Sequence, residues 1–199
     1  MNHKINFTPE QTAELAKMMS GELYDASANS TLLELLGECQ DRCHEYNQLR
    51  PSQHAERAEM MRQLLGSTGE RFKILSPFMC DYGFNITIGE NFFANAGLVI
   101  LDEAPVTFGD NVFIAPNCGF YTAGHPLDVA TRNAGKQYSL PIVVGDNVWI
   151  GGGVSVLPGV TIGDGVVIGA GSVVTHDIPS GFLAVGNPCR PIRRIDTAQ

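Results

Sequence analysis

The sequence has no run of eighteen consecutive apolar residues, so it does not predict a membrane-spanning helix. Its first residues, MNHKINFTPEQ, also lack the apolar stretch of a secretory signal peptide. Basic residues are scarce, 13 against 21 acidic ones, and the net charge of −8 argues against nucleic acid or an anionic membrane as partner. The five cysteines are scattered and odd in number, which argues against a disulfide framework and predicts a reducing cytoplasm.

Several signatures of catalysis and cofactor binding are absent as well. The chain contains neither GxGxxG after a strand nor GxxxxGK[ST], the two common phosphate-binding loops. It has no GxSxG elbow for a nucleophilic serine. No pair of cysteines has zinc-finger spacing, and the sequence predicts no metal in the functional site.

What the sequence does contain is a repeat with a period of six residues. One apolar series is Val144, Ile150, Val156, Ile162, Ile168 and Val174. A second series, two residues before the first, is Ile142, Val148, Val154, Val160, Val166 and Ser172. Residues two apart face the same side of a strand, and the glycines that follow four members of the first series permit tight corners. The period predicts short strands, three to a coil of about eighteen residues, stacked around an aliphatic interior.

Earlier stretches keep this phase. They comprise Ile86, Ile88, Phe92, Ala94, Leu98 and Ile100, and then Val106, Phe108, Val112, Ile114, Cys118 and Phe120. From Ile100 to Phe108 the step is eight, so one corner carries two extra residues. Between Phe120 and Val144 the pattern stops in a polar, turn-rich insertion, and such an insertion in a regular scaffold is a common place for function.

Residues 8 to 72 are predicted to be helical. Thr8 can cap a helix that starts at Pro9 and ends at Gly21. A second helix is expected from Ser30 to Tyr46, and a third after Pro51-Ser52 that stops near Gly66. This segment is the expected cover for the open strand edges at the start of the repeat.

Three features outside the repeat allow two interpretations each. Asp25, in GELYDAS, is either a helix cap, which the sequence alone favours, or a group offered to a ligand. Cys39 and Cys43 share a helix face and are expected to be small buried side chains, since a metal would need more ligands. Arg190, Arg193 and Arg194 in the tail indicate an anion site or a solvated end of the chain.

The repeat region offers two histidines, His125 in the insertion and His176 near its end. Imidazole is the side chain best suited to act as a general base near neutral pH. Gly124 and Pro126 flank His125 and restrict the local backbone, which suits a base held in place. An exposed loop histidine without a catalytic role is the other interpretation.

Taken together, these motifs resemble the hexapeptide-repeat acyltransferases, and among them the maltose and galactoside O-acetyltransferases. The resemblance covers nearly the whole chain. Its motifs are GELYDAS, CDYGFNITIGENFFAN, LDEAPVTFGDNVFIAPN, YTAGHP, PIVVGDNVWIGGGVSVLPGVTIGDGVVIGAGSVVTHDIP and GNPCRPIRRI. It implies a mainly β fold, a left-handed parallel β-helix with an N-terminal α-helical segment. The expected division is a helical segment over 1–73, the β-helix over 74–186 with an inserted loop at about 122–141, and a tail over 187–199.

The resemblance also implies a reaction, the direct transfer of acetyl from acetyl-CoA to a hydroxyl of a sugar such as maltose, glucose or a galactoside. His125 would be the general base. The acceptor-binding residues would be Asp25, which reverses the preference for a cap, together with Asn95, Asp81, Phe93 and Glu103. The family acts as homotrimers with active sites between neighbouring subunits, so a homotrimer is expected here, with no metal requirement.

The resemblance also assigns the residues that would bind acetyl-CoA and stabilise the charge that forms on its carbonyl oxygen. The N–H of Gly152 would stabilise the oxyanion. The remaining cofactor-binding positions would be Ala170 and Thr175 along the pantetheine arm, Arg190 and Arg193 at the phosphates, His176 and the outward-facing Trp149. Relatives often carry Lys at 176, Asp at 103 and Asn at 97, where this chain has His176, Glu103 and Gly97. His176 leaves one phosphate contact open, Glu103 leaves one acceptor contact open, and Gly97 leaves open an acceptor that differs from theirs.

Other classes of function fit these residues less well. A metalloenzyme on the same scaffold, like the γ-type carbonic anhydrases, needs about three converging histidines, and only His125 and His176 lie in the repeat, on different coils. A non-catalytic β-helix binding protein has no need of the histidine-bearing insertion. An acetyltransferase for serine or an antibiotic stays open, although serine acetyltransferases usually have a longer helical N-terminus.

Overall fold

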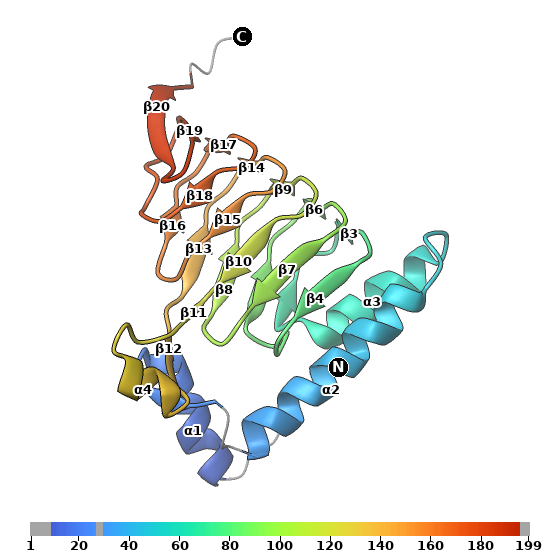
Figure 1. The fold of residues 1–199 in the computed structure, drawn as a ribbon. Coiled ribbons are helices and arrows are strands. Elements are labelled where there is room, and N and C mark those ends of the chain that lie inside the picture. The colour runs from blue at the N-terminus through green and yellow to red at the C-terminus, as the bar shows by residue number, and fades with distance from the viewer. Residues whose placement is uncertain (1–8, 27–29, 196–199) are drawn as a thin grey trace.

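The computed structural model describes residues 9–26 and 30–195 of the chain. Two helices of the N-terminal segment lie against one end of a solenoid of short strands, and the first helix lies near the insertion (Figure 1). The helices are α1 (Pro9–Ser20), α2 (Ser30–Gln48), α3 (His54–Leu64) and the short α4 (Val129–Asn133). The architecture is therefore the predicted one, a mainly β parallel β-helix with an N-terminal helical segment.

The three predicted N-terminal helices are confirmed, with small shifts at their ends. α1 starts at Pro9 and stops before Gly21, whose φ of +79° favours glycine, while the proposed cap Thr8 lies outside the described residues. α2 continues two residues beyond the expected end at Tyr46. α3 begins at His54, just after Pro51-Ser52.

Consecutive strands of the solenoid belong to different sheets, so the chain turns through three parallel sheets in each coil. The first sheet contains β2 (Ser67–Thr68), β5 (Ile86–Ile88), β8 (Val106–Phe108), β13 (Ile142–Val144) and β16 (Thr161–Ile162). The second contains β3 (Phe72–Ile74), β6 (Phe92–Ala94), β9 (Phe113–Ile114), β14 (Trp149–Ile150), β17 (Val167–Ile168), β19 (Phe182–Val185) and β20 (Arg190–Arg194). The third contains β4 (Phe78–Cys80), β7 (Leu98–Leu101), β10 (Gly119–Tyr121), β15 (Ser155–Val156) and β18 (Val173–Val174).

The predicted inward positions form the core. Every residue of both period-six series is buried, including Ser172, whose hydroxyl donates to the carbonyl of Gly169. Three inward phenylalanines, Phe92, Phe108 and Phe120, stack edge to face with centroids 5.1 and 4.9 Å apart. Each buried aliphatic or aromatic side chain contributes about 1.5–3 kcal/mol, so the stacked coils supply the main stabilisation of the fold.

Side chains from successive coils also bond along one corner of the solenoid. Asp110 Oδ1 accepts from the N–H of Glu90 at 2.7 Å, and Asp146 Oδ1 accepts from the N–H of Asp110 at 2.8 Å. Beside this ladder, the amide of Asn111 links Asn91 and Asn147, and all three asparagines have φ between 55° and 57°. Asparagine tolerates this left-handed conformation, so it serves at these corners as glycine does at others.

Two departures from the regular coil lie at the corner between the third sheet and the first. The eight-residue step falls between β7 and β8, as predicted, and holds the buried residues Asp102 and Glu103. The insertion after β10 contains β11 (Ala123–Gly124), α4 and β12 (Lys136–Ser139). β12 pairs antiparallel with β11 and with β1 (Tyr24–Asp25), so the insertion is joined to the segment after α1.

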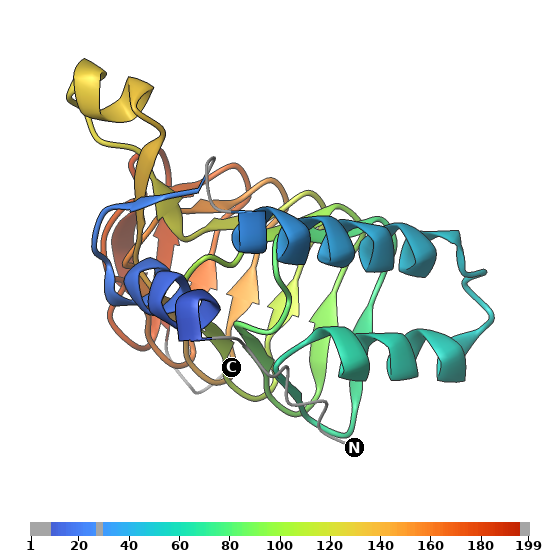
Figure 2. The same cartoon turned by 90° about the horizontal axis from the view of Figure 1, so that it is seen from below.

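α2 and α3 cover the N-terminal end of the solenoid, with α2 packed against β4 (Figure 2). Tyr46 and Asn47, at the end of α2, bond the carbonyls of Ile74 and Phe78 at 2.6 and 2.9 Å. The parallel sheets already include β2, which starts before residue 74. The division of the chain into a helical segment, a β-helix and a tail is kept as an interpretation.

Candidate active site

The insertion fixes the position of His125. This residue follows β11 directly and its side chain is exposed in the single chain. In the register of β11 with β12, Gly124 faces Tyr138, and a Cβ at Gly124 would lie 2.5 Å from Cζ of that ring. Only glycine permits this approach, so the strand pair sets where the backbone of His125 leaves the sheet.

Two buried acidic residues form the corner on which the insertion rests. The Thr122 hydroxyl lies 2.7 Å from the carbonyl of Leu101 and 3.2 Å from Glu103 Oε2. Asp102 Oδ1 accepts the N–H groups of Asp81 and Tyr82 at 3.0 and 2.9 Å. Asp102 therefore holds the segment after β4 in place and brings Asp81 to the same corner as Glu103.

The acidic groups at this corner are held in a poorly solvated environment. Burial, together with the charge of Asp81, raises the pKa of Glu103 to about 8. Burial raises the pKa of Asp102 to about 7, and it raises the pKa of Asp81 as well. Within the described residues, Asp102 Oδ2 is buried without a hydrogen-bond partner. A carboxyl that keeps its proton near pH 7 can donate a hydrogen bond to an acceptor molecule.

Asp25 reaches this region through β1. It pairs with Lys136 in the antiparallel register, and the two side chains form an ion pair of 3.7 Å. The preceding Tyr24 is buried, and its hydroxyl accepts a hydrogen bond from Gln137. α2 starts five residues after Asp25, at Ser30, so the helix cap favoured by the sequence alone is wrong: strand pairing places this carboxylate instead.

A second group of predicted residues stacks along a different corner of the solenoid, between the second and third sheets. Asn95 follows β6, Gly152 follows β14 and Ala170 follows β17. Gly152 accepts the N–H of Gly171 in the next coil at 2.8 Å. Its own N–H has no acceptor among the residues that the structure describes, so this donor is available to a ligand.

The outer face of the second sheet, which ends at the corner of Asn95, presents apolar rings. Phe93 pairs in register with Phe113, and Phe113 with Trp149, so the three rings follow one another across successive strands. Trp149 is 56% exposed and Phe113 48% exposed in the single chain. The predicted outward orientation of Trp149 is confirmed.

The predicted cofactor residues near the C-terminal end also lie outside the core. The hydroxyl of Thr175 is 2.8 Å from Nδ1 of His176, just after β18. Arg190 and Arg193 are exposed on β20, which runs antiparallel to β19 at the edge of the second sheet. Nη1 of Arg190 donates to the carbonyl of Cys189, just before the strand, and Nη1 of Arg193 donates to the carbonyl of Arg194.

One chain thus brings together only part of the predicted site. Asp81, Glu103 and His125 follow β4, β7 and β11 at one corner, and Asp25 lies in β1, which pairs with β12 of the insertion at that corner. Asn95, Gly152 and Ala170 occupy another corner of the same triangular section. The sequence did not single out Thr122, Lys136 or Tyr24, which position this acidic corner. Tyr24 and Thr122 are marked in the sequence only by their place in the motifs GELYDAS and YTAGHP, and Lys136 only by its place in the insertion.

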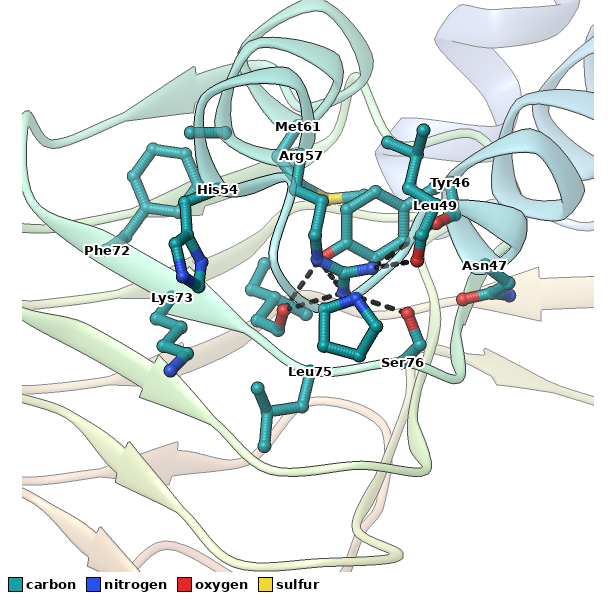
Figure 3. A pocket seen from close by; sticks show the side chains of 13 residues that line it. Tyr46, Asn47, Leu49, His54, Arg57, Met61, Phe72, Lys73, Leu75 and Ser76 are labelled. Atoms are coloured by element: carbon teal, nitrogen blue, oxygen red, sulfur yellow. Dashed lines mark hydrogen bonds between the residues drawn. The ribbon is translucent and has the colours of Figure 1, made fainter.

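A separate cavity of about 650 Å³ lies between the end of α2, α3 and β3 (Figure 3). Its central cation, Arg57, is buried and lies over the ring of Tyr46 at 4.2 Å. Its guanidinium donates to the carbonyls of Leu49 and Ile74 and to the hydroxyl of Ser76. Arg57 thereby ties the two helices to the first coil. None of the predicted site residues lines this cavity.

The chain matches two family models. Residues 17–69 match the maltose acetyltransferase hexapeptide capping motif, and residues 141–176 match the bacterial transferase hexapeptide, six repeats. A putative acetyltransferase of Saccharomyces cerevisiae is 55% identical over 181 residues, which cover 91% of this chain and 92% of that protein. This chain belongs to the hexapeptide-repeat acetyltransferases.

The chain is also similar to solved structures of two sugar acetyltransferases. A maltose O-acetyltransferase from Clostridium difficile 630 is 48% identical with a TM-score of 0.90, over 92% of this chain and 97% of the other. A galactoside acetyltransferase in complex with coenzyme A is 41% identical with a TM-score of 0.88, over 96% and 92% of the two chains. The expected left-handed parallel β-helix is consistent with these neighbours. No helix in the described ranges is long and apolar enough to cross a membrane.

Proposed function

We propose that this acetyltransferase moves an acetyl group from acetyl-CoA to a hydroxyl of a small sugar, with His125 as general base. The observation that carries the proposal is the three-stranded sheet of β1, β12 and β11, which joins the histidine-bearing insertion to Asp25. The solved structure of a galactoside acetyltransferase in complex with coenzyme A supports acetyl-CoA as the donor. The names of the two solved relatives support a sugar as acceptor.

In the proposed reaction, the imidazole of His125 takes the proton of the acceptor hydroxyl as its oxygen attacks the thioester carbonyl. A C–O bond forms, and the negative charge passes to the carbonyl oxygen. The N–H of Gly152 then stabilises this oxyanion. When the intermediate collapses, the C–S bond breaks and CoA leaves with the proton from the imidazolium. No covalent enzyme intermediate and no metal are required.

Acetyl-CoA is proposed to bind along the C-terminal part of the solenoid. Ala170 and Thr175 would contact the pantetheine arm. Arg190 and Arg193 would meet the phosphates, since a guanidinium stays charged and offers paired donors. His176, bonded to Thr175, and Trp149 complete the proposed cofactor side.

The acceptor is proposed to bind at the acidic corner. Asp25, Asp81 and Glu103 offer carboxyl groups that can donate or accept hydrogen bonds to several sugar hydroxyls. Asn95 and Phe93 would contact the acceptor from the other side of the site. A non-sugar acceptor such as serine or an antibiotic remains the alternative, because Glu103 and Gly97 differ from the residues that sugar-acetylating relatives often have.

We further propose a homotrimer whose active sites lie between neighbouring subunits. The separation of the predicted residues between two corners supports this arrangement, because a second subunit can bring its Asn95 corner against the His125 corner of the first. The exposed rings of Phe113 and Trp149 would be covered at the contact. The free state of all five cysteines suits a reducing compartment, and the cytoplasm is the proposed location.

The experiment that tests the function is release of CoA from acetyl-CoA, followed with a thiol reagent over a panel of acceptors. The panel holds maltose, glucose, galactosides, amino sugars, serine and chloramphenicol, with acceptor-free reactions as blanks. Release that depends on a sugar and is lost in His125→Ala would support the proposal. Release with serine or chloramphenicol alone would assign the alternative acceptor class. No release with any acceptor would overturn the enzymatic proposal.

A further inference from the structure

Helix α2 and the third sheet bring three buried cysteines together at the N-terminal end of the solenoid. Cys39 and Cys43 are four residues apart and therefore share one face of α2. Cys80 is the inward residue at the end of β4, the strand on which this face packs. The sequence showed only the helical pair, because Cys80 is 37 residues beyond Cys43 and approaches it only in the folded chain.

The sulfur positions match those of ligands around one ion. Sγ of Cys80 lies 3.5 Å from Sγ of Cys39 and 3.7 Å from Sγ of Cys43. All three sulfurs lie within 4.8 Å of one another. Zinc binds thiolate at about 2.3 Å, so two sulfurs on one tetrahedral ion are about 3.8 Å apart. A disulfide bond would need about 2.05 Å, and all five cysteines of the chain are free.

The surroundings of the cluster are apolar. The three side chains are 3%, 4% and 3% exposed and belong to the core that continues into the solenoid. Thiolate sulfur is a soft ligand that selects thiophilic ions and disfavours hard ones such as Mg²⁺. The position between α2 and β4 means that an ion held here would join the helical segment to the first coil.

We propose that Cys39, Cys43 and Cys80 form a structural site for a thiophilic divalent metal ion of the zinc type. Binding removes the proton of each coordinating thiol to solvent and forms metal–sulfur bonds, with no change of oxidation state. Three thiolates leave one position of a tetrahedral ion for a non-protein ligand. The site is separate from the acetyl-transfer chemistry, which needs no metal, and its role is to stabilise the packing of α2 on β4.

The test uses Cd²⁺, whose bonds to thiolate give a charge-transfer absorption in the ultraviolet. The full-length protein is unfolded and refolded under reducing conditions with Cd²⁺, because buried thiols are open to the ion only before α2 packs. The expected result is one Cd²⁺ per chain with thiolate absorption, reduced when a large excess of Zn²⁺ is present during refolding and unaffected by Mg²⁺. Bound Cd²⁺ should also raise the melting temperature, since a ligand that binds the folded state stabilises it.

The chain supplies matched variants. Cys80→Ala should lose both the absorption and the thermal shift. The double variant Cys118→Ala, Cys189→Ala removes the two buried cysteines outside the cluster and should keep both. Refolded wild-type protein without thiolate absorption or bound Cd²⁺ would overturn the proposal, whatever the variants do. Absorption that survives in Cys80→Ala, or that disappears in the double variant, would overturn it equally.

Discussion

His125 is the residue on which the proposed chemistry depends. Its replacement by alanine removes the general base, and we expect kcat to fall by about 10²- to 10⁴-fold. Binding of CoA should persist, because the imidazole side chain does not hold the cofactor in the proposed arrangement. Steady-state kinetics together with calorimetric titration of CoA measure the two effects.

The matched control for this variant is His176→Ala, which removes the other histidine of the repeat, also exposed. It should leave kcat within a few-fold of wild type and act on the KM for acetyl-CoA. Equal losses of kcat in both variants would show that His125 has no special role as a base.

Glu103 should make the stability of the fold depend on pH. Its pKa is raised from 4.5 to about 8, so between these values the folded state keeps a proton that the unfolded state has lost. The stabilisation linked to this proton is complete below 4.5 and disappears as pH rises through about 8. Glu103→Gln should flatten this part of the dependence, measured by urea unfolding at several pH values.

For Glu103→Gln, the control is Glu59→Gln on α3, which removes the same charge from an exposed position. The control should keep the wild-type slope of unfolding free energy against pH. If the free energy of unfolding depends on pH in the same way in Glu103→Gln and in the wild type, the buried carboxyl is ionised in the folded protein.

Residue positions in the core could be predicted from the sequence because they follow a strict period. Within a strand, a side chain two residues from an inward one also points inward, regardless of how the strands are arranged in the fold. The role of Asp25 could not be predicted this way. Its strand forms only because β12 returns to it from more than a hundred residues later, and local capping preference says nothing of that.

At the scale of elements, β11 and β12 are expected to act as a rigid support for the base. In Gly124→Ala the new methyl group would meet the Tyr138 ring, and the strand pair must shift. We expect kcat to fall about ten-fold or more, since small displacements of a catalytic group are costly. The KM for acetyl-CoA should change little.

A second substitution separates displacement from unfolding in this case. Tyr138→Ala makes room for the methyl group, so the double variant should recover part of the kcat lost in Gly124→Ala. Additive losses in the double variant would argue against the steric explanation, and circular dichroism would report whether either chain has unfolded.

Strand β20 is the element proposed to meet the phosphates of acetyl-CoA. Arg190→Ala and Arg193→Ala should each raise the KM for acetyl-CoA several-fold. The ratio of mutant to wild-type KM should shrink at high salt, because salt screens the attraction between each guanidinium and the phosphates in the wild-type protein. kcat at saturating acetyl-CoA should stay near the wild-type value. Kinetics at two ionic strengths measure both.

Arg194→Ala is the matched control on the same strand, because its guanidinium lies over the ring of Phe182 at 5.1 Å. We expect it to leave the KM for acetyl-CoA unchanged. If all three variants behave alike, the tail acts as a general positive patch and the individual phosphate assignments are wrong.

At the scale of the whole molecule, the proposed shared active site allows complementation between inactive subunits. His125→Ala and Asn95→Ala damage opposite corners, so a neighbouring pair in a mixed trimer can combine one intact corner from each. Random mixing in equal amounts should restore about a quarter of the wild-type sites over all trimers, which is about one site in three in the trimers that contain both variants. Co-refolding of differently tagged variants, isolation of mixed trimers and activity assay measure this recovery.

Mixed trimers that remain as inactive as the two parent variants would place the whole site within one chain. Sedimentation gives the oligomeric state independently.

The solenoid could be predicted from the sequence because the inward residues of each coil recur with a period of six. The sequence could not predict which corners face each other across subunits, since this depends on contacts that no single chain contains.

The antiparallel direction of β20 affects whether molecules of this protein can join end to end in concentrated solution. Each coil of the solenoid presents the same parallel edge that received the coil before it, so an unfinished end would recruit further chains without limit. β20 reverses direction against β19 and ends the longest sheet, while α2 and α3 cover the opposite end. The two ends of the solenoid are therefore closed by elements of the chain itself. Neither end offers a parallel edge to which another solenoid could add, so the molecule does not grow into a fibre.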